Sequence, residues 1–228
     1  MKKTLALLAI LAAPALYAAS IEFEDGYGPY QVGQGGEFTF GETGLSLNGY
    51  VSGTTANVLG GRDQSFQSFC VSPVYVYAGV NYTVTPSDFT DEDNQLNAGI
   101  AWLYSQFATG GNFGGYATYN YGAGRTTSAA QLQDAIWALV GNSDLTSEVG
   151  LPVGYDSSNP FESAAVKEFG SWTAATAGVP IWSDVVSILL LNNDGDAQSQ
   201  LYHVPDGGAT MVLLGIALSG LAIYRRRV

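Results

Sequence analysis

The spacing of apolar residues changes near residue 96, and this change limits the possible folds of the chain more than any other feature. Between residues 21 and 86 the apolar residues fall in short alternating runs separated by glycine-containing turns, which is typical of short β-strands. From residue 96 onward they recur at helical spacing, at Leu96, Ile100, Leu103, Tyr104 and Phe107. Strands followed by helices predict an α+β fold.

The strand-like part contains several short runs that predict a β-sandwich or a barrel. The clearest runs cover residues 37–40, 45–51, 68–71, 74–77 and 81–84. A later apolar run at residues 185–191 is followed by turn residues and then by residues 200–204, which predicts a hairpin that closes the body.

Two more helices are expected, and with the first they form a small helical subdomain. Ser128 is the predicted N-cap of one, with Gln131 as its capping-box partner and Gly141 just beyond its end. Asn159 is the predicted N-cap of the other, because proline follows it at the first helical position. Residues 21–203 are therefore expected to form one α+β body.

Both ends of the chain are expected to lie outside this body. Residues 1–19 place two lysines before an apolar run and small residues, which is the order of a secretory signal peptide. Residues 209–224 form an uncharged apolar segment, and with Gly207 and Gly208 counted it is at the short end of the roughly 17–25 residues that span a bilayer. Arginines at 225–227 are expected to stay in the cytoplasm. We therefore predict export through the Sec pathway, a C-terminal transmembrane helix, and a body outside the cytoplasm.

The body carries a strongly acidic charge, which excludes one large class of partner. Between the two terminal segments, three basic residues stand against nineteen acidic residues, a net charge of −16. Nucleic-acid binding needs a basic surface, so no nucleic-acid partner is expected. The acid-rich runs at 91–94 and 192–196 lack the spacing of an EF-hand, and no phosphate-binding motif occurs. No metal and no cofactor are therefore expected.

Cys70 is the only cysteine of the chain, and it follows Phe69 in an aromatic–cysteine–apolar run. Without an intramolecular disulfide partner, it is either an inert buried thiol or a reactive group. A cysteine protease needs a base beside its thiol, and His203, the single histidine, lies just before the C-terminal segment. A catalytic Cys–His pair is therefore disfavoured, and the chain is not expected to be an enzyme.

A glutamine on the predicted helix after Ser128 offers Cys70 a different chemistry. Gln133 and Trp137 are four residues apart on one face of that helix, and Gln133 flanks its buried stripe. A cysteine sulfur that attacks a glutamine carboxamide expels ammonia and leaves a thioester, provided that the protein holds the two side chains in contact. Aromatic neighbours, for which Phe69 and Trp137 are the candidates, would shield the product from water.

These two motifs resemble those of the bacterial thioester domains of surface adhesins. The run around Cys70 and the Gln-x-Ala-Ile-Trp string at residues 133–137 carry the resemblance, which covers about residues 45–145. It implies a β-rich body with a helical subdomain and an internal thioester between Cys70 and Gln133. It also implies that an amine of a host or matrix molecule attacks that bond.

The C-terminal segment resembles the VPDSG-type relatives of the PEP-CTERM sorting signals. The motif consists of Val204, Pro205, Asp206, Gly207 and Gly208, with Gly207 where the commonest form has serine. The apolar segment and the arginines follow it in order. The resemblance implies recognition by an exosortase-like membrane enzyme at a bacterial cell envelope, often in an exopolysaccharide setting.

Two functions remain open at this point. The first is an exported, envelope-anchored surface protein that acts as a covalent adhesin or matrix cross-linker through the thioester. The alternative is a non-covalent structural or exopolysaccharide-associated surface protein in which Cys70 is inert. The expected partners are the sorting enzyme, the membrane through the C-terminal helix, and an amine-bearing or polysaccharide target.

Overall fold

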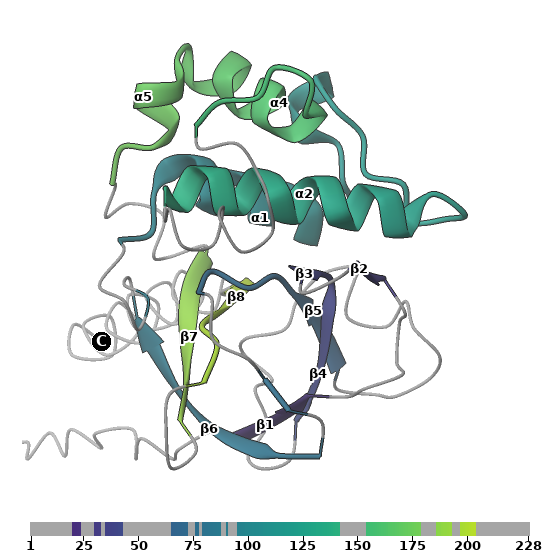
Figure 1. The fold of residues 1–228 in the computed structure, drawn as a ribbon, viewed down its shortest axis with the longest axis vertical. Helices are drawn as coiled ribbons and strands as arrows, with labels where there is room; N and C mark the ends of the chain where they lie inside the picture. Colours follow the sequence, from purple (N-terminus) through teal and green to yellow (C-terminus); the bar gives the residue numbers. More distant parts are fainter. Residues whose placement is uncertain are drawn as a thin grey trace, which may run out of the picture.

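The fold consists of a curved antiparallel sheet with two layers of helices over one of its ends (Figure 1). The computed structural model describes residues 20–23, 30–32, 35–42, 65–72, 76–77, 79–87, 90, 95–141, 154–178, 186–192 and 197–203. The predicted signal peptide, the predicted strand at 45–51 and the whole C-terminal segment from Val204 lie outside these residues. The expected α+β class is confirmed for the part that the structure describes.

Six strands form the main sheet, in the order β5-β4-β1-β6-β7-β8, and each neighbouring pair is antiparallel. Their bounds are Ser20–Phe23 (β1), Phe38–Glu42 (β4), Ser65–Ser68 (β5), Asn81–Ser87 (β6), Val186–Asn192 (β7) and Gln200–His203 (β8). The predicted closing hairpin is confirmed as the β7–β8 pair. A separate two-stranded ribbon joins β2 (Gln31–Val32) to β3 (Gly35–Gly36).

The two edges of the main sheet meet just after β5. The Val71 N–H donates to Ser199 O and the Leu201 N–H donates to Phe69 O, both at 3.0 Å. Between these bonds, Cys70 lies opposite Gln200 in an antiparallel bridge. The sheet therefore closes on itself as a barrel, which decides between the two predicted architectures. Cys70 lies in the seam of that closure.

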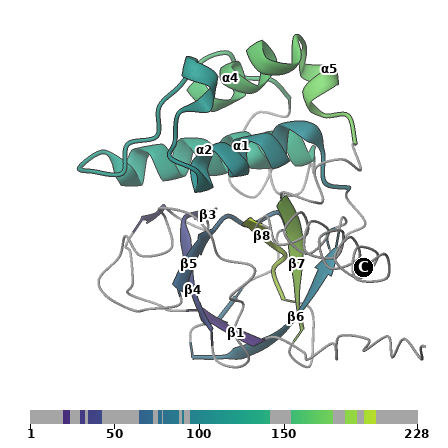
Figure 2. The same ribbon diagram turned by 180° about the vertical axis from the view of Figure 1, so that it is seen from behind.

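The helices form two layers, which Figures 1 and 2 show from opposite sides. Next to the sheet lie α1 (Ala98–Ala108) and α2 (Arg125–Val140), joined by a loop that contains the short helix η1 (Phe113–Gly115). The outer layer holds α4 (Pro160–Phe169) and α5 (Trp172–Ala175). The expected stripe on α1 and the Asn159 cap of α4 are confirmed, since the Asn159 side chain accepts from Phe161 N–H and Glu162 N–H.

The predicted start of α2 is wrong by one turn. The helix begins at Arg125 with Gly124 as its N-cap, and the Ser128 hydroxyl accepts a hydrogen bond from the Asn120 N–H at 3.1 Å instead of capping the helix. The predicted end is correct, because Gly141 adopts the left-handed conformation (φ 72°) that favours glycine. The extra turn places Arg125 at the start of the helix.

The buried apolar side chains of the described residues form two clusters. The larger lies between the helices and the sheet and contains Phe69, Phe107, Leu132 and Ile136. The other lies inside the barrel and contains Phe40, Tyr82, Cys70 and Trp137. Among the described residues, no helix has the length and apolar character that crossing a bilayer requires. The predicted transmembrane segment is not among the residues described.

Candidate functional site

Cys70 reaches the barrel interior because successive side chains along the seam point to opposite faces of the sheet. Phe69 points toward α1, where its ring meets Phe107 edge-on with centroids 4.9 Å apart. Cys70, one residue later, points the opposite way into the interior cluster, as strand geometry requires. Both side chains are fully buried. Phe69 therefore anchors the seam to α1 and does not join the cluster around the thiol.

Gln133 projects from α2 onto the backbone and side chain of Cys70. The Cys70 N–H donates to the Gln133 carbonyl oxygen Oε1 at 3.2 Å, and the Gln133 amide nitrogen Nε2 donates to Cys70 O at 2.8 Å. The Cys70 Sγ lies 3.4 Å from the same Oε1. Gln133 is only 1% exposed, and among the described residues both polar atoms of its carboxamide bond to Cys70. The structure thus brings together the two residues that the sequence singled out.

Trp137 and Gly35 enclose this pair. Trp137 lies one turn beyond Gln133 on α2 and belongs to the same interior cluster as Cys70. Gly35 on β3 packs so closely that a Cβ there would lie 2.6 Å from Trp137 Cη2 and 2.7 Å from Gln133 Cγ. Only glycine leaves room for both side chains at this point. Trp137 thus lies in the same buried cluster as Cys70, and its shielding role stays a prediction.

The environment of the Cys70 thiol favours its neutral form. Burial raises the pKa of the thiol well above its usual range, while the nearby indole N–H of Trp137 lowers it by a smaller amount. The thiol lies 3.4 Å from the Gln133 carbonyl oxygen, so the adjacent carboxamide accepts its hydrogen bond.

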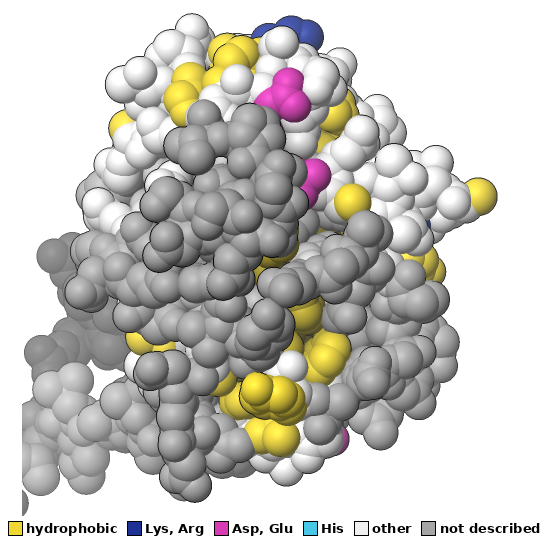
Figure 3. All heavy atoms as spheres, in the orientation of Figure 1, with side chains coloured by type: hydrophobic (Ala, Val, Ile, Leu, Met, Phe, Trp, Pro, Cys, Tyr) yellow, Lys and Arg dark blue, Asp and Glu magenta, His cyan; other side chains and the backbone are white. Residues whose placement is uncertain are grey.

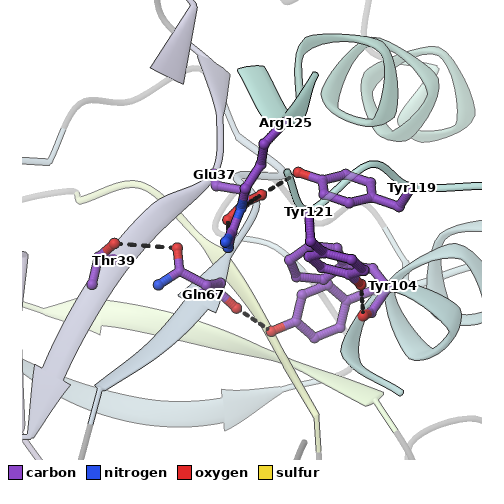
Figure 4. A network of polar contacts seen from close by, with 8 residues as sticks. Glu37, Thr39, Gln67, Tyr104, Tyr119, Tyr121 and Arg125 are labelled. Carbon is purple, nitrogen blue, oxygen red and sulfur yellow. Dashed lines mark hydrogen bonds and ion pairs between the residues drawn. The ribbon is translucent and has the colours of Figure 1, made fainter. Parts of the chain in front are cut away.

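A second buried cluster lies two turns before Gln133 on α2, and sequence reasoning missed it. Arg125 donates from Nε to Glu37 Oε1 at 2.8 Å and from Nη2 to Glu37 Oε2 at 2.6 Å. Tyr119 also donates to Glu37, and the guanidinium lies 4.2 Å from the ring centre of Tyr30. Figure 4 shows Glu37, Arg125 and Tyr119 directed at one another from separate parts of the chain. Because Glu37 follows β3, this ion pair holds α2 against the ribbon that contacts Gln133.

A cavity of about 510 Å³ lies at the C-terminal end of α2, outside the Cys70–Gln133 pair. Among the described residues that line it are Gln95, Asn97, Trp172 and Thr176, which carry no charge. The ring of Trp172 is paired with that of Tyr155, with centroids 5.5 Å apart, and Tyr155 is 44% exposed. The described lining is uncharged and includes an aromatic ring, which suits a neutral polar ligand better than an ion.

On the face in Figure 3, most of the described surface is uncharged, with apolar side chains in patches, a few acidic groups, and a cationic group at the upper edge. Among the residues that the structure describes, no group of three or more His, Cys, Asp or Glu side chains could hold a metal ion.

Comparison with known proteins identifies the C-terminal segment. Residues 203–228 match the family described as the VPDSG-CTERM motif, which includes Val204, Pro205, Asp206, Gly207 and Gly208. No curated protein and no solved structure matches the chain. The motif marks the chain as an exported, envelope-associated surface protein of the kind that an exosortase-like enzyme processes.

Proposed function

We propose that this surface protein forms an internal thioester between Cys70 and Gln133 and uses it to attach covalently to an amine. The observation that carries the proposal is the seating of the Gln133 carboxamide on Cys70, with both polar atoms of the amide bonded to the Cys70 backbone and Sγ 3.4 Å from Oε1. Such contact converts a reaction between two molecules into one within a single molecule, which is a large kinetic advantage.

The formation step balances without a cofactor. The Cys70 sulfur bonds to the Gln133 carbonyl carbon Cδ, and the bond from Cδ to Nε2 breaks. The thiol proton ends on Nε2, which already carries two hydrogens, so the nitrogen leaves as ammonia. The Cys70 N–H, at 3.2 Å from Oε1, is placed to stabilise the negative charge that develops on that oxygen.

The opening step delivers the protein to its target. A primary amine attacks Cδ, the bond from Cδ to Sγ breaks, and one amine proton ends on the sulfur. The products are an amide between residue 133 and the target and a free Cys70 thiol. Each molecule reacts once, so the protein is a covalent adhesin or matrix cross-linker and not an enzyme. Burial of both residues protects the bond from water before the target arrives.

Intact-mass measurement tests the proposal directly. The mature protein, purified in amine-free buffer, is expected to be lighter than its sequence mass by one molecule of ammonia. Cys70→Ala and Gln133→Ala are expected to restore the full mass for each variant. Gln131→Ala is the matched control: it removes a glutamine from the same helix, two residues away and only partly buried, and is expected to keep the deficit. Full sequence mass in freshly prepared wild-type protein would contradict the proposal.

A second function has its own supporting observation. The uncharged cavity beside the Tyr155–Trp172 pair has the aromatic and amide groups that contact sugars, which favours non-covalent association with an exopolysaccharide. In that case Trp172→Ala weakens retention on an immobilised neutral polysaccharide such as dextran. Tyr116→Ala, which removes an exposed tyrosine elsewhere, leaves retention unchanged. Equal retention of the wild type and both variants would rule out this cavity as the binding site.

A further inference from the structure

We propose that the indole N–H of Trp137 donates a hydrogen bond to the Cys70 sulfur while the thioester opens. This inference rests on the proposed function and assigns a role to a residue that neither the sorting motif nor the Cys–Gln chemistry requires. It would make Trp137 a direct participant, in addition to its place in the shield around the pair.

The first observation is a buried donor without a partner. Trp137 is 4% exposed, and its Nε1 makes no hydrogen bond of ordinary geometry with the residues that the structure describes. A buried N–H left unpaired is unfavourable, and most such groups in folded proteins find a partner. An unpaired donor beside a reactive group is therefore a candidate for a hydrogen bond that forms only when charge develops during the reaction.

The second observation is the position of the indole. Trp137 lies one helical turn from Gln133 and packs with Cys70 in the interior cluster. Gly35 contacts the edge of the indole and Gln133 Cγ, so the ring and the carboxamide are held in one arrangement. The same indole N–H lowers the pKa of the Cys70 thiol, which is the electrostatic effect of a donor directed at the sulfur.

The third step is the distribution of charge along the reaction. The carbonyl oxygen of Gln133 already has a donor, the Cys70 N–H. When the amine opens the thioester, the sulfur gains negative charge as its bond to Cδ breaks, and burial makes that charge unfavourable. The described structure gives the sulfur no cation, so the Trp137 N–H is the group placed to stabilise it. The Cys70 N–H thus stabilises negative charge on the oxygen, and the Trp137 N–H stabilises negative charge on the sulfur.

The test compares Trp137→Phe with wild type in the reaction with methylamine. Phenylalanine keeps an aromatic shield and removes the N–H. Thioester content is measured by intact mass, and opening is followed as the gain in mass when methylamine adds. We expect Trp137→Phe to open at least about tenfold more slowly, since a single donor to a developing charge contributes a factor of about 10²–10³ to the rate in enzymes. Trp102→Phe, which replaces another buried tryptophan on α1, is expected to react like wild type.

The outcomes separate this inference from the proposed function. A wild type without the ammonia deficit overturns both. A wild type with the deficit, together with a folded Trp137→Phe variant that opens at the same rate, overturns only the role of the indole.

A measurement on wild-type protein covers the case in which Trp137→Phe fails to fold. The chain has four tryptophans, so the Trp137 indole resonance is assigned by elimination with Trp→Phe variants at positions 102, 172 and 182. We expect this resonance to shift when methylamine opens the bond. An unchanged resonance would overturn the inference.

Discussion

Two buried polar pairs connect α2 to the β-rich part, and they differ in charge. Arg125 and Glu37 carry full charges, joined by two hydrogen bonds and supported by Tyr119. Gln133 and Cys70 are neutral, and the amide bonds to the backbone of its partner. A buried ion pair resists any change, because separating its members leaves a charge in an apolar interior. A neutral pair in contact has no such barrier to bond exchange, so we assign clamping to the first and chemistry to the second.

Removing the cation of the clamp is expected to have the largest effect. Arg125→Met leaves Glu37 buried without its partner, and the free energy of unfolding should fall by about 3–5 kcal/mol in urea titration. Because α2 carries Gln133 as well, the fraction of molecules that have lost ammonia should fall with it.

Two variants sharpen this test. Adding Glu37→Gln to Arg125→Met removes the stranded charge and should recover part of the stability. Lys167→Met removes an exposed cation and should change the free energy of unfolding by less than about 0.5 kcal/mol. A loss below about 1 kcal/mol in Arg125→Met would show that the ion pair does not hold α2.

Gly35 is the point at which the neutral pair is most sensitive to packing. Gly35→Ala forces a methyl group into contact with Trp137 and Gln133, and overpacking of this kind costs about 1–3 kcal/mol. The displaced carboxamide should also lower the yield of the mass deficit. Gly122→Ala is the control, because that glycine is exposed and its Cβ would meet only the Asn120 side chain at 3.2 Å. Normal stability and a full mass deficit in Gly35→Ala would disprove the tight enclosure.

Glu162 is a third buried polar side chain, and among the described residues no salt bridge pairs it with a cation. Its replacement is expected to have the smallest effect. The pKa of Glu162 is raised from 4.5 to about 7, mainly by burial and in smaller part by the charges of Asp156 and Asp134, while the hydrogen bond from the Asp156 N–H opposes the rise. The folded state therefore binds the proton more tightly than the unfolded state, and the free energy of unfolding falls as pH rises from about 4.5 to about 7.

Urea titrations across that pH range measure this effect. After a discount for solvent screening, Glu162 should account for a loss of about 1 kcal/mol. Glu162→Gln should flatten the profile, whereas Glu168→Gln, at an exposed position on the same helix, should leave it unchanged. An identical profile in Glu162→Gln would show that this carboxyl does not cause the pH dependence of stability.

The sequence predicted the parts of the fold that depend on local chemistry. The β7–β8 hairpin, the stripe of α1 and the Asn159–Pro160 start of α4 follow from periodicity and capping, and all three form. The prediction of where α2 begins was wrong because a tertiary contact determines that position. Arg125 pairs with Glu37 across 88 positions of sequence, and no local signal records that pairing.

The same distinction applies to the candidate site. Cys70 and Gln133 could be predicted because a lone cysteine and a Gln-x-Ala-Ile-Trp string can be recognised in the sequence itself. Gly35 and Glu37 could not, since their roles depend on a ribbon that folds back onto α2. Phe69 was expected to shield the thiol, but strand alternation turns it toward α1.

Peptide mapping after methylamine treatment tests the central claim most directly. Wild-type protein is incubated with methylamine, denatured, alkylated at free thiols and digested. The account predicts N-methylglutamine at position 133 together with an alkylated Cys70, and neither methylamine incorporation nor a mass deficit in Cys70→Ala. Recovery of ordinary glutamine at position 133 in the wild type, with no methylamine in any peptide, would contradict it.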